Sequence, residues 1–353
     1  MKGLIREGDR SERVADVQAR LRALGIEVED ESGLFGARTK ESVRTFQQQR
    51  GLLADGIVGP DTWTALVEAG WRFGDRVLYF KNPPMRGDDV LSLQARMNAL
   101  GFDAGREDGI FGRDTDRAVR AFQHEYAIAE DGIFGPRSFT ALRGLRADRE
   151  HTAAGLREEL RHLEGKGIQR SLIVIDPGHG GEDTGDAGQG GPSEADLCWD
   201  LAERLAAALA GAGGRVRFTR TETEGPDASE RARRANEVDG DIFLSLHLNS
   251  HSEPTADGAS TYYFPRSRAG EILADCVKDH LVHLGLRDCR SHPRTYSILR
   301  ETRMPAVLVE PAFITNPDEA KMLLDPDFRA TLATAIAAGV RHYFEGVPAV
   351  SEA

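Results

Sequence analysis

The sequence predicts two small all-α repeats of three helices each, followed by an α/β domain whose largely parallel mixed sheet is flanked by helices. Two observations support this prediction. The first part of the 353-residue chain contains an internal repeat, and from Ser171 onward strand-like apolar segments alternate with helical ones. Hydrophobic residues make up 40% and charged residues 29% of the chain, which is a globular composition.

The internal repeat has an offset of 76 residues and runs without a gap. Its matched segments are VADVQARLRALG (14–25) with VLSLQARMNALG (90–101), GLFGARTKESVRTFQ (33–47) with GIFGRDTDRAVRAFQ (109–123), and DGIVGPDTWTAL (55–66) with DGIFGPRSFTAL (131–142). In each copy, apolar residues recur at helical spacing and a glycine follows the last of them as a stop signal. A D-G-x-x-G-P turn then places proline at the start of a third short helix. Each copy is therefore predicted to be a three-helix module.

Both copies resemble the peptidoglycan-binding domain 1 family, whose members carry L-Q-x-x-L-x-x-x-G, D-G-x-F-G-x-x-T, A-V-x-x-F-Q and D-G-x-x-G. The first copy departs from this pattern at Glu31-Ser32-Gly33, where the family usually has aspartate before glycine. The resemblance implies that exposed residues of the repeats bind peptidoglycan. The apolar residues Phe46, Leu66, Phe122 and Leu142 are expected to build the cores.

The domain boundaries follow from these segments. We expect the two peptidoglycan-binding repeats to span residues 1–74 and 75–146, and the α/β domain to span residues 170–347. The stretch between them, residues 147–169, is dense in charge and has leucines at helical spacing. It is expected to be a charged linker with one marginal amphipathic helix.

The α/β domain is expected to alternate strands and helices. Strands are predicted at SLIVID (171–176), RVRFTR (215–220), DIFLSL (241–246), GASTYYF (258–264) and AVLVE (306–310), and helices at residues 194–210, 229–238, 269–284 and 327–344. Such alternation is typical of a parallel sheet with helices on both faces. In sheets of this kind, functional groups gather at the carboxyl ends of the strands.

Four candidate side chains occur where these strands end. His179 lies in a glycine-rich loop after the first strand, and Glu194 closes that loop and opens the next helix. His247 follows DIFLSL, and Glu310 ends AVLVE. Two histidines and one carboxylate from separate elements are the ligand set expected of catalytic zinc with an open fourth position. We therefore predict a Zn²⁺ site at His179, Glu194 and His247. Glu310 is then available as a base.

The same region resembles the zinc-dependent N-acetylmuramoyl-L-alanine amidase family known as amidase type 3. The shared motifs are, in order, DPGHGG (176–181), Glu194, Thr219-Arg220, ERARRAN (230–236), SLHLN (245–249) and PAVLVEPAFITN (305–316). The match covers residues 171–345. By position, the resemblance places the metal ligands on His179, Glu194 and His247 and the catalytic glutamate on Glu310. The family usually has glycine two residues after that glutamate, and Pro311-Ala312 departs from it, which puts the fit of the substrate in question.

The resemblance implies hydrolysis of the amide between the lactyl group of N-acetylmuramic acid and the L-alanine of the stem peptide, by water that zinc activates. Glu310 would take a proton from the water and return it to the departing amine. Asn249 and Arg300 are weaker candidates for binding the substrate. Asp176 is expected to have a structural role or to orient a ligand.

The composition excludes some partners. A net charge of −12 and a pI near 5.4 argue against a nucleic acid. No stretch is long and apolar enough to span a membrane, and the amino-terminal residues show no secretory signal. We therefore expect the protein to be cytoplasmic as synthesised and to act at the cell wall if it is exported or released. The three cysteines form no CxxC pair and predict no disulfide framework.

Three alternatives stay open. The repeats, the missing signal and the stretches SEADLCWDLA and GLRDCR resemble an actinobacterial branch of the amidase family. Some members of that branch have lost zinc ligands and are cytoplasmic regulators of cell-wall precursor synthesis, a role that would involve a protein partner. All four site residues are present here, which favours catalysis. The second alternative is a phage or secreted lysin, and the third is a zinc peptidase that cuts the stem peptide.

Overall fold

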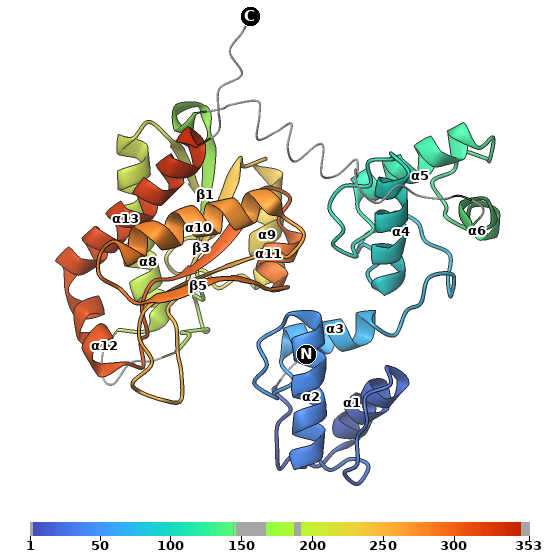
Figure 1. The fold of residues 1–353 in the computed structure, drawn as a ribbon, viewed down its shortest axis with the longest axis horizontal. Helices are drawn as coiled ribbons and strands as arrows, with labels where there is room; N and C mark the ends of the chain where they lie inside the picture. Colours follow the sequence, from blue (N-terminus) through green and yellow to red (C-terminus); the bar gives the residue numbers. More distant parts are fainter. Residues whose placement is uncertain (1–2, 144, 146–166, 187–191, 347–353) are drawn as a thin grey trace, which may run out of the picture. The chain divides into compact units, whose positions relative to one another are not determined.

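The computed structural model describes residues 3–143, 145, 167–186 and 192–346 (Figure 1). The chain forms two compact units, Met1–Glu158 and Glu159–Ala353. Most of the predicted charged linker, with its amphipathic helix, lies outside the described residues. Among the described residues, no helix is both long and apolar enough to cross a bilayer. Cys198, Cys276 and Cys289 are all free.

The first unit consists of two three-helix repeats, as the sequence predicts. Their helices are α1 (Glu12–Ala23), α2 (Ala37–Arg50) and α3 (Pro60–Glu68), then α4 (Asp88–Ala99), α5 (Arg113–Glu125) and α6 (Pro136–Arg143). Each repeat has a core of its own. Phe46, Leu66, Phe122 and Leu142 are buried in these cores, which confirms the structural role expected of them.

A buried glutamine in the first helix of each repeat, Gln18 or Gln94, holds the turn before the second helix. In the second repeat, Gln94 Nε2 donates to Asp108 Oδ1 at 2.8 Å, and Oε1 accepts from the amide of the next glycine at 2.8 Å. In the first repeat Ser32 stands at the position of Asp108, and Gln18 Nε2 donates to the carbonyl oxygen of Glu31 at 3.2 Å. Ser32 in place of aspartate therefore changes one hydrogen-bond acceptor of the glutamine, and the turn itself is the same in both repeats.

The second unit contains a six-stranded mixed sheet in the order β2-β1-β3-β6-β4-β5. Its strands are β1 (Leu172–Pro177), β2 (Arg215–Phe218), β3 (Ile242–Leu246), β4 (Ala259–Tyr263), β5 (Asp288–Pro293) and β6 (Ala306–Glu310). Four of the five strand pairs are parallel, and β4 pairs with β6 antiparallel. This confirms the largely parallel mixed sheet, although β5 was not among the predicted strands.

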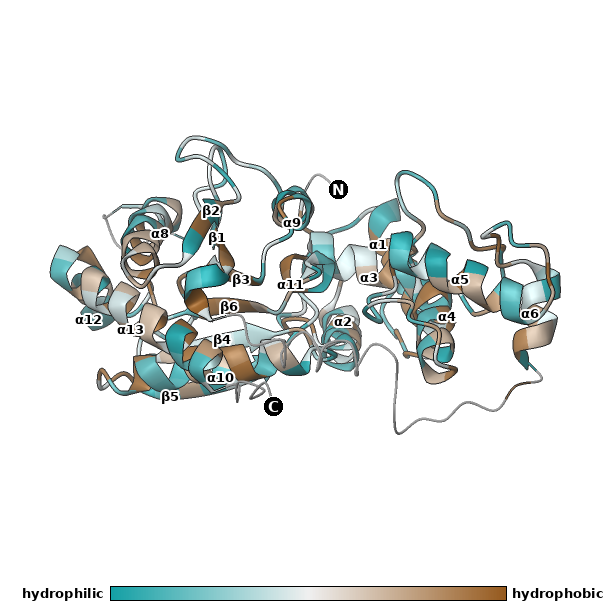
Figure 2. Cartoon of the chain, turned by 90° about the horizontal axis from the view of Figure 1, so that it is seen from above, coloured by the Kyte–Doolittle hydropathy of each residue, from teal (hydrophilic) through white to brown (hydrophobic). Residues whose placement is uncertain are grey.

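Helices cover both faces of the sheet (Figure 1). The larger core lies under α8 (Glu194–Gly211), α10 (Arg268–Val282) and α13 (Pro326–Glu345), with α12 (Pro317–Leu324) beside it. A smaller core lies on the opposite face under α9 (Ala228–Glu237) and α11 (Ser297–Glu301). Figure 2 shows the central strands β1, β3 and β6 as hydrophobic, as expected for strands that are buried on both faces.

The alternation of side chains along each strand decides which side chains lie at the carboxyl-terminal edge of the sheet. Val174, Phe243 and Leu308 belong to the smaller core. Because side chains two residues apart on a strand share a face, Asp176, Ser245 and Glu310 continue this face to the ends of β1, β3 and β6. The sheet thereby gathers polar groups at the edge where the sequence predicts the site.

Candidate metal centre and active site

The three predicted metal ligands come together from three elements of the second unit. One ligand atom from each of His179, Glu194 and His247 lies within 4.8 Å of the others. Glu194 Oε1 lies 3.1 Å from His179 Nε2 and 3.2 Å from His247 Nδ1. The two imidazole rings are 4.9 Å apart between centroids and inclined at 76°. Two imidazole nitrogens and a carboxylate oxygen thus converge on one point.

Glu194 is fixed by its place at the amino terminus of α8. Ser193 caps this helix and forms a capping box with Asp196, so the first turn has a defined position. The Glu194 side chain is buried. Its Oε2 accepts from the amide of Asp186 at 2.9 Å, and its Oε1 accepts from the amide of Leu248 at 2.9 Å. Both carboxylate oxygens are therefore oriented before any ion binds.

Glycines let the loop after β1 pass close to the ligands. A Cβ atom on Gly178 would lie 2.6 Å from Cε1 of His247, and one on Gly185 would lie 2.6 Å from Oε2 of Glu194. Gly185 also has a φ of +66°, which favours glycine. His179 itself has a φ of 57°, an uncommon backbone conformation for a residue with a side chain. In this backbone conformation the His179 ring faces Glu194.

Asp183 orients the His179 ring from the other side. Its Oδ2 lies 3.0 Å from Nδ1 of His179, while Nε2 of the same ring faces Glu194. A carboxylate on the second ring nitrogen is the usual outer partner of a metal-binding histidine, because it selects the tautomer and holds the ring. This role of Asp183 is not visible in the sequence motifs.

Asp176 has a structural role, one of the two alternatives expected of it. Its buried carboxylate accepts from Arg231 Nη1 at 2.8 Å, from Ser245 Oγ at 2.7 Å and from Thr219 Oγ1 at 2.5 Å. These partners come from α9, from β3 and from the end of β2. Asp176 therefore ties together the strand ends beneath the metal ligands.

Arg220 supports the loop that carries His179. Its Nε donates to the carbonyl oxygen of Pro177 at 2.9 Å, and its Nη2 donates to that of Gly178 at 3.0 Å. Its guanidinium also lies over the ring of Trp199, 5.4 Å from the centroid. Burial lowers the pKa of Arg220 from its ordinary value. The Thr-Arg motif thus holds the backbone just before the first metal ligand.

The charges of the centre suit a cation. Burial opposes ionisation of Glu194, but the two histidine rings outweigh it and hold the pKa of Glu194 well below its usual range. Burial also opposes a charge on both rings. It lowers the pKa of His247, whereas the carboxylates of Glu194 and Asp183 raise the pKa of His179. An ionised carboxylate between two imidazoles is the donor set that zinc prefers, so these residues fit the expected ion.

Glu310 lies at the carboxyl end of β6, opposite Ser260 in the antiparallel pairing with β4. Ser260 Oγ lies 3.3 Å from Glu310 Oε2 and 3.2 Å from the hydroxyl oxygen of Tyr262. Burial, together with the negative charge of Glu194, raises the pKa of Glu310 to about 7. The carboxyl group can therefore exchange a proton near neutral pH, as a general base and acid requires.

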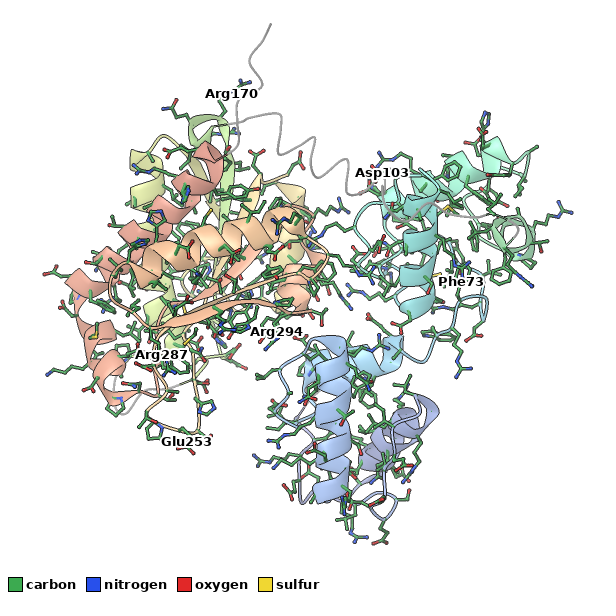
Figure 3. All side chains as sticks on the ribbon, in the orientation of Figure 1. Phe73, Asp103, Arg170, Glu253, Arg287 and Arg294 are labelled. Carbon is green, nitrogen blue, oxygen red and sulfur yellow. The ribbon has the colours of Figure 1, made fainter. Side chains whose placement is uncertain are left out.

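Ser260, Tyr262 and Arg294, the last labelled in Figure 3, surround Glu310 and belong to none of the sequence motifs. The Arg294 guanidinium lies 5.9 Å from the centroid of the Tyr262 ring, and its charge acts to lower the pKa of Glu310. A sequence signal for these residues was weak. They are brought to the site by the long-range pairing of β4 with β6 on one side and with β5 on the other.

The two weaker substrate candidates have different surroundings. Asn249 Nδ2 donates to Ser260 Oγ at 3.2 Å, and the backbone of Asn249 bonds to Ala312 and Ile314 at 2.9 and 2.8 Å. Asn249 therefore holds the Pro311-Ala312 loop beside Glu310. Arg300 lies in α11, the short helix before β6. A role in binding the substrate stays a prediction for both residues.

Both units of the chain are similar to known proteins. Residues 173–342 match the N-acetylmuramoyl-L-alanine amidase family, and residues 10–66 and 86–142 match a peptidoglycan-binding domain family. The amidase CwlM of Mycobacterium tuberculosis is 41% identical and covers 96% of this chain and 89% of its own. The amidase LytC of Bacillus subtilis is 33% identical and covers 49% of this chain and 35% of its own.

A solved structure of the amidase AmiC2 of Nostoc punctiforme is 30% identical, covers 51% of this chain and 99% of its own, and gives a TM-score of 0.48. The family matches agree in position with the repeats and with the metal centre. Together with the relative that is similar over nearly the full length, they show that this chain belongs to the N-acetylmuramoyl-L-alanine amidase family.

Proposed function

We propose that the protein is a zinc-dependent amidase that hydrolyses the bond between the lactyl group of N-acetylmuramic acid and the L-alanine of the stem peptide. The observation that carries this proposal is the convergence of His179, Glu194 and His247, with Glu310 on the neighbouring strand end. The family match and the names of the relatives support the choice of bond.

His179, Glu194 and His247 would hold the ion. A zinc ion bound there would supply an activated water at neutral pH and polarise the carbonyl of the bond to be cut. Glu310 would accept a proton from the attacking water and return it to the departing amine. Ser260, through its contact with Oε2, holds the Glu310 carboxylate in place for both transfers. No residue needs to form a covalent intermediate.

The two repeats would retain the protein on peptidoglycan while the second unit cuts it. The peptidoglycan-binding family match of both repeats supports this assignment. We propose residues 1–74 and 75–146 as the binding repeats and residues 170–347 as the catalytic domain. The action would take place at the cell wall once the protein reaches it.

The test is digestion of purified peptidoglycan with product analysis by mass spectrometry, with zinc and with a chelator. We expect intact stem peptides with new amino-terminal L-alanine, and no release when zinc is removed. Cuts inside the stem peptide would replace the amidase proposal with a zinc peptidase. If the protein binds zinc and releases no product, the regulator of precursor synthesis becomes the better account.

A further inference from the structure

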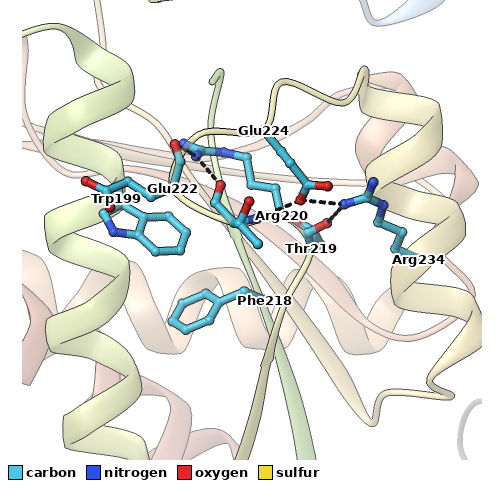
Figure 4. A pocket seen from close by; sticks show the side chains of 8 residues that line it. Trp199, Phe218, Thr219, Arg220, Glu222, Glu224 and Arg234 are labelled. Atoms are coloured by element: carbon cyan, nitrogen blue, oxygen red, sulfur yellow. Dashed lines mark hydrogen bonds and ion pairs between the residues drawn. The ribbon is translucent and has the colours of Figure 1, made fainter. Parts of the chain in front are cut away.

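A pocket of about 420 Å³ lies at the β2 edge of the sheet (Figure 4). In the strand order, this edge lies on the opposite side of the metal centre from β6, the strand that carries Glu310. Its lining includes Trp199, Phe218, Arg220, Glu222, Glu224 and Arg234. This volume lies within the range of small-molecule sites. The mechanism described above uses none of these side chains except Arg220, which supports the loop of His179.

Two aromatic rings form one wall of this pocket. The rings of Trp199 and Phe218 have centroids 5.3 Å apart and are inclined at 39°. The Phe218 side chain is 37% exposed although it ends a strand of the sheet, and Trp199 is half-buried. Because the Arg220 guanidinium lies over the Trp199 ring, Phe218 is the ring that remains for a ligand. An exposed aromatic ring suits a ligand with an apolar face, because the electron-rich face of the ring attracts C–H groups.

The rest of the lining is polar and balanced in charge. Arg234 Nη1 lies 3.1 Å from Glu224 Oε2, and Arg220 Nη1 donates to the carbonyl oxygen of Glu222 at 3.2 Å. Two carboxylates and two guanidinium groups thus surround the aromatic wall. A balanced set of donors and acceptors favours a neutral ligand with many hydroxyl groups over an ion.

The pocket borders two elements that support the metal centre, namely helix α8 and the loop that carries Glu224. Trp199 follows Glu194 by five residues on α8, or roughly 7.5 Å along the helix axis. The loop that carries Glu224 packs on the loop of His179 so tightly that a Cβ on Gly180 would lie 2.3 Å from the Glu224 carbonyl oxygen. The loops of Glu224 and His179 therefore form a wall that the pocket shares with the metal centre.

We propose that this pocket is a saccharide subsite, in which Phe218, supported by Trp199, stacks against a sugar ring of the glycan strand next to the reacting muramic acid. This inference rests on the proposed amidase function for its substrate. The sugar presents its apolar C–H face to the Phe218 ring and its hydroxyl and acetamido groups to the polar rim. The subsite makes the enzyme prefer a muropeptide that belongs to a glycan chain over a single sugar that carries a peptide.

The kinetic test compares kcat/KM for two soluble substrates, N-acetylmuramoyl-peptide and an oligosaccharide of alternating N-acetylglucosamine and N-acetylmuramoyl-peptide. We expect the ratio of the two to favour the oligosaccharide. Phe218→Ala and Trp199→Ala should each lower this ratio about twofold to tenfold, the size of one aromatic contact. Phe218→Tyr keeps a ring and should retain the ratio. Leu284→Ala is the matched control, since Leu284 is similarly exposed, at 40%, but lies after α10.

A second measurement does not depend on hydrolysis. The protein has three tryptophans, and the indole N–H signal of Trp199 is assigned by its loss in Trp199→Phe. Addition of peptide-free glycan oligosaccharide should shift this signal in the NMR spectrum of the full chain. An unmoved signal, or a ratio that Phe218→Ala leaves unchanged, would overturn the subsite. If neither substrate is cut while the signal shifts, the amidase proposal fails and the saccharide subsite stands.

Discussion

At the residue scale, Glu310 carries most of the chemistry assigned to this chain. It lies partly buried at a strand end, near the negative charge of Glu194. These surroundings raise its pKa to about 7, from an ordinary value of 4.5. A bound cation would offset the charge of Glu194, so the raised value belongs to the metal-free protein.

A first prediction concerns the stability of the metal-free protein. The folded chain holds the Glu310 proton more tightly than the unfolded chain does, so the free energy of unfolding should fall as pH rises from about 4.5 to 7. Glu310→Gln has no proton to lose and should escape this loss. In chelator, the melting temperature of the variant relative to the unaltered protein should rise between pH 5 and pH 8. We expect a gain of about 2–3 kcal/mol, or roughly 4–12 °C for a unit of this size.

Zinc is the control for this effect. Adding it should shrink the pH-dependent difference, because a cation at His179, Glu194 and His247 favours the ionised form of Glu310. A melting difference that stays constant from pH 5 to pH 8 in chelator would show that the Glu310 carboxyl has an ordinary pKa.

At the scale of elements, the site depends on how tightly the strand ends are tied together. Asp176 accepts hydrogen bonds from Arg231, Ser245 and Thr219 in a buried position. Removing its charge would leave the Arg231 guanidinium buried without a counter-ion.

The second prediction follows from this anchor. Asp176→Asn should destabilise the second unit by about 3–5 kcal/mol, as expected when one partner of a buried ion pair is lost. Asp200→Asn is the matched control. Asp200 also pairs with two arginines, Arg204 and Arg329, but it is partly exposed and should contribute about 1 kcal/mol or less. Denaturant unfolding of both variants measures the difference, and equal losses would contradict the anchor role.

The elements also show what could be predicted from the sequence. The buried strands β1, β3 and β6 have long apolar runs, and their ends place His179, His247 and Glu310 by simple alternation. The edge strand β5 has no such signal, because its residues, DCRSHP, are polar and partly exposed. The antiparallel register that sets Ser260 opposite Glu310 joins segments 50 residues apart, so Ser260 and Tyr262 could not be assigned to the site in advance.

The sequence patterns also could not predict the local backbone conformation of the loops. Glu194 was placed correctly because a capping residue and a helix start are visible in the sequence. The contact of Asp183 with the His179 ring depends on the positive φ angle of His179. A single sequence gives no sign of that conformation.

At the scale of the whole molecule, the two compact units suggest a division of labour. The third prediction is that residues 1–145 bind insoluble peptidoglycan without cutting it, because the described residues of that part hold no set of metal ligands. The fragment 168–353 should cut soluble muropeptides nearly as well as the full chain. Sedimentation with wall material and a rate assay test the two halves. If the repeats fail to sediment with the wall, they are better explained as docking units for a protein partner.

The most direct test of the account measures zinc content and hydrolysis rate in the same preparation of Glu310→Gln. Glutamine keeps the size of the side chain but cannot accept the proton. The account predicts one zinc per chain, as in the unaltered protein, and a rate of L-alanine amine release that falls by roughly 10²- to 10⁴-fold. Retention of the full rate, or loss of zinc together with the rate, would contradict the assignment of Glu310 as the base beside a separate metal centre.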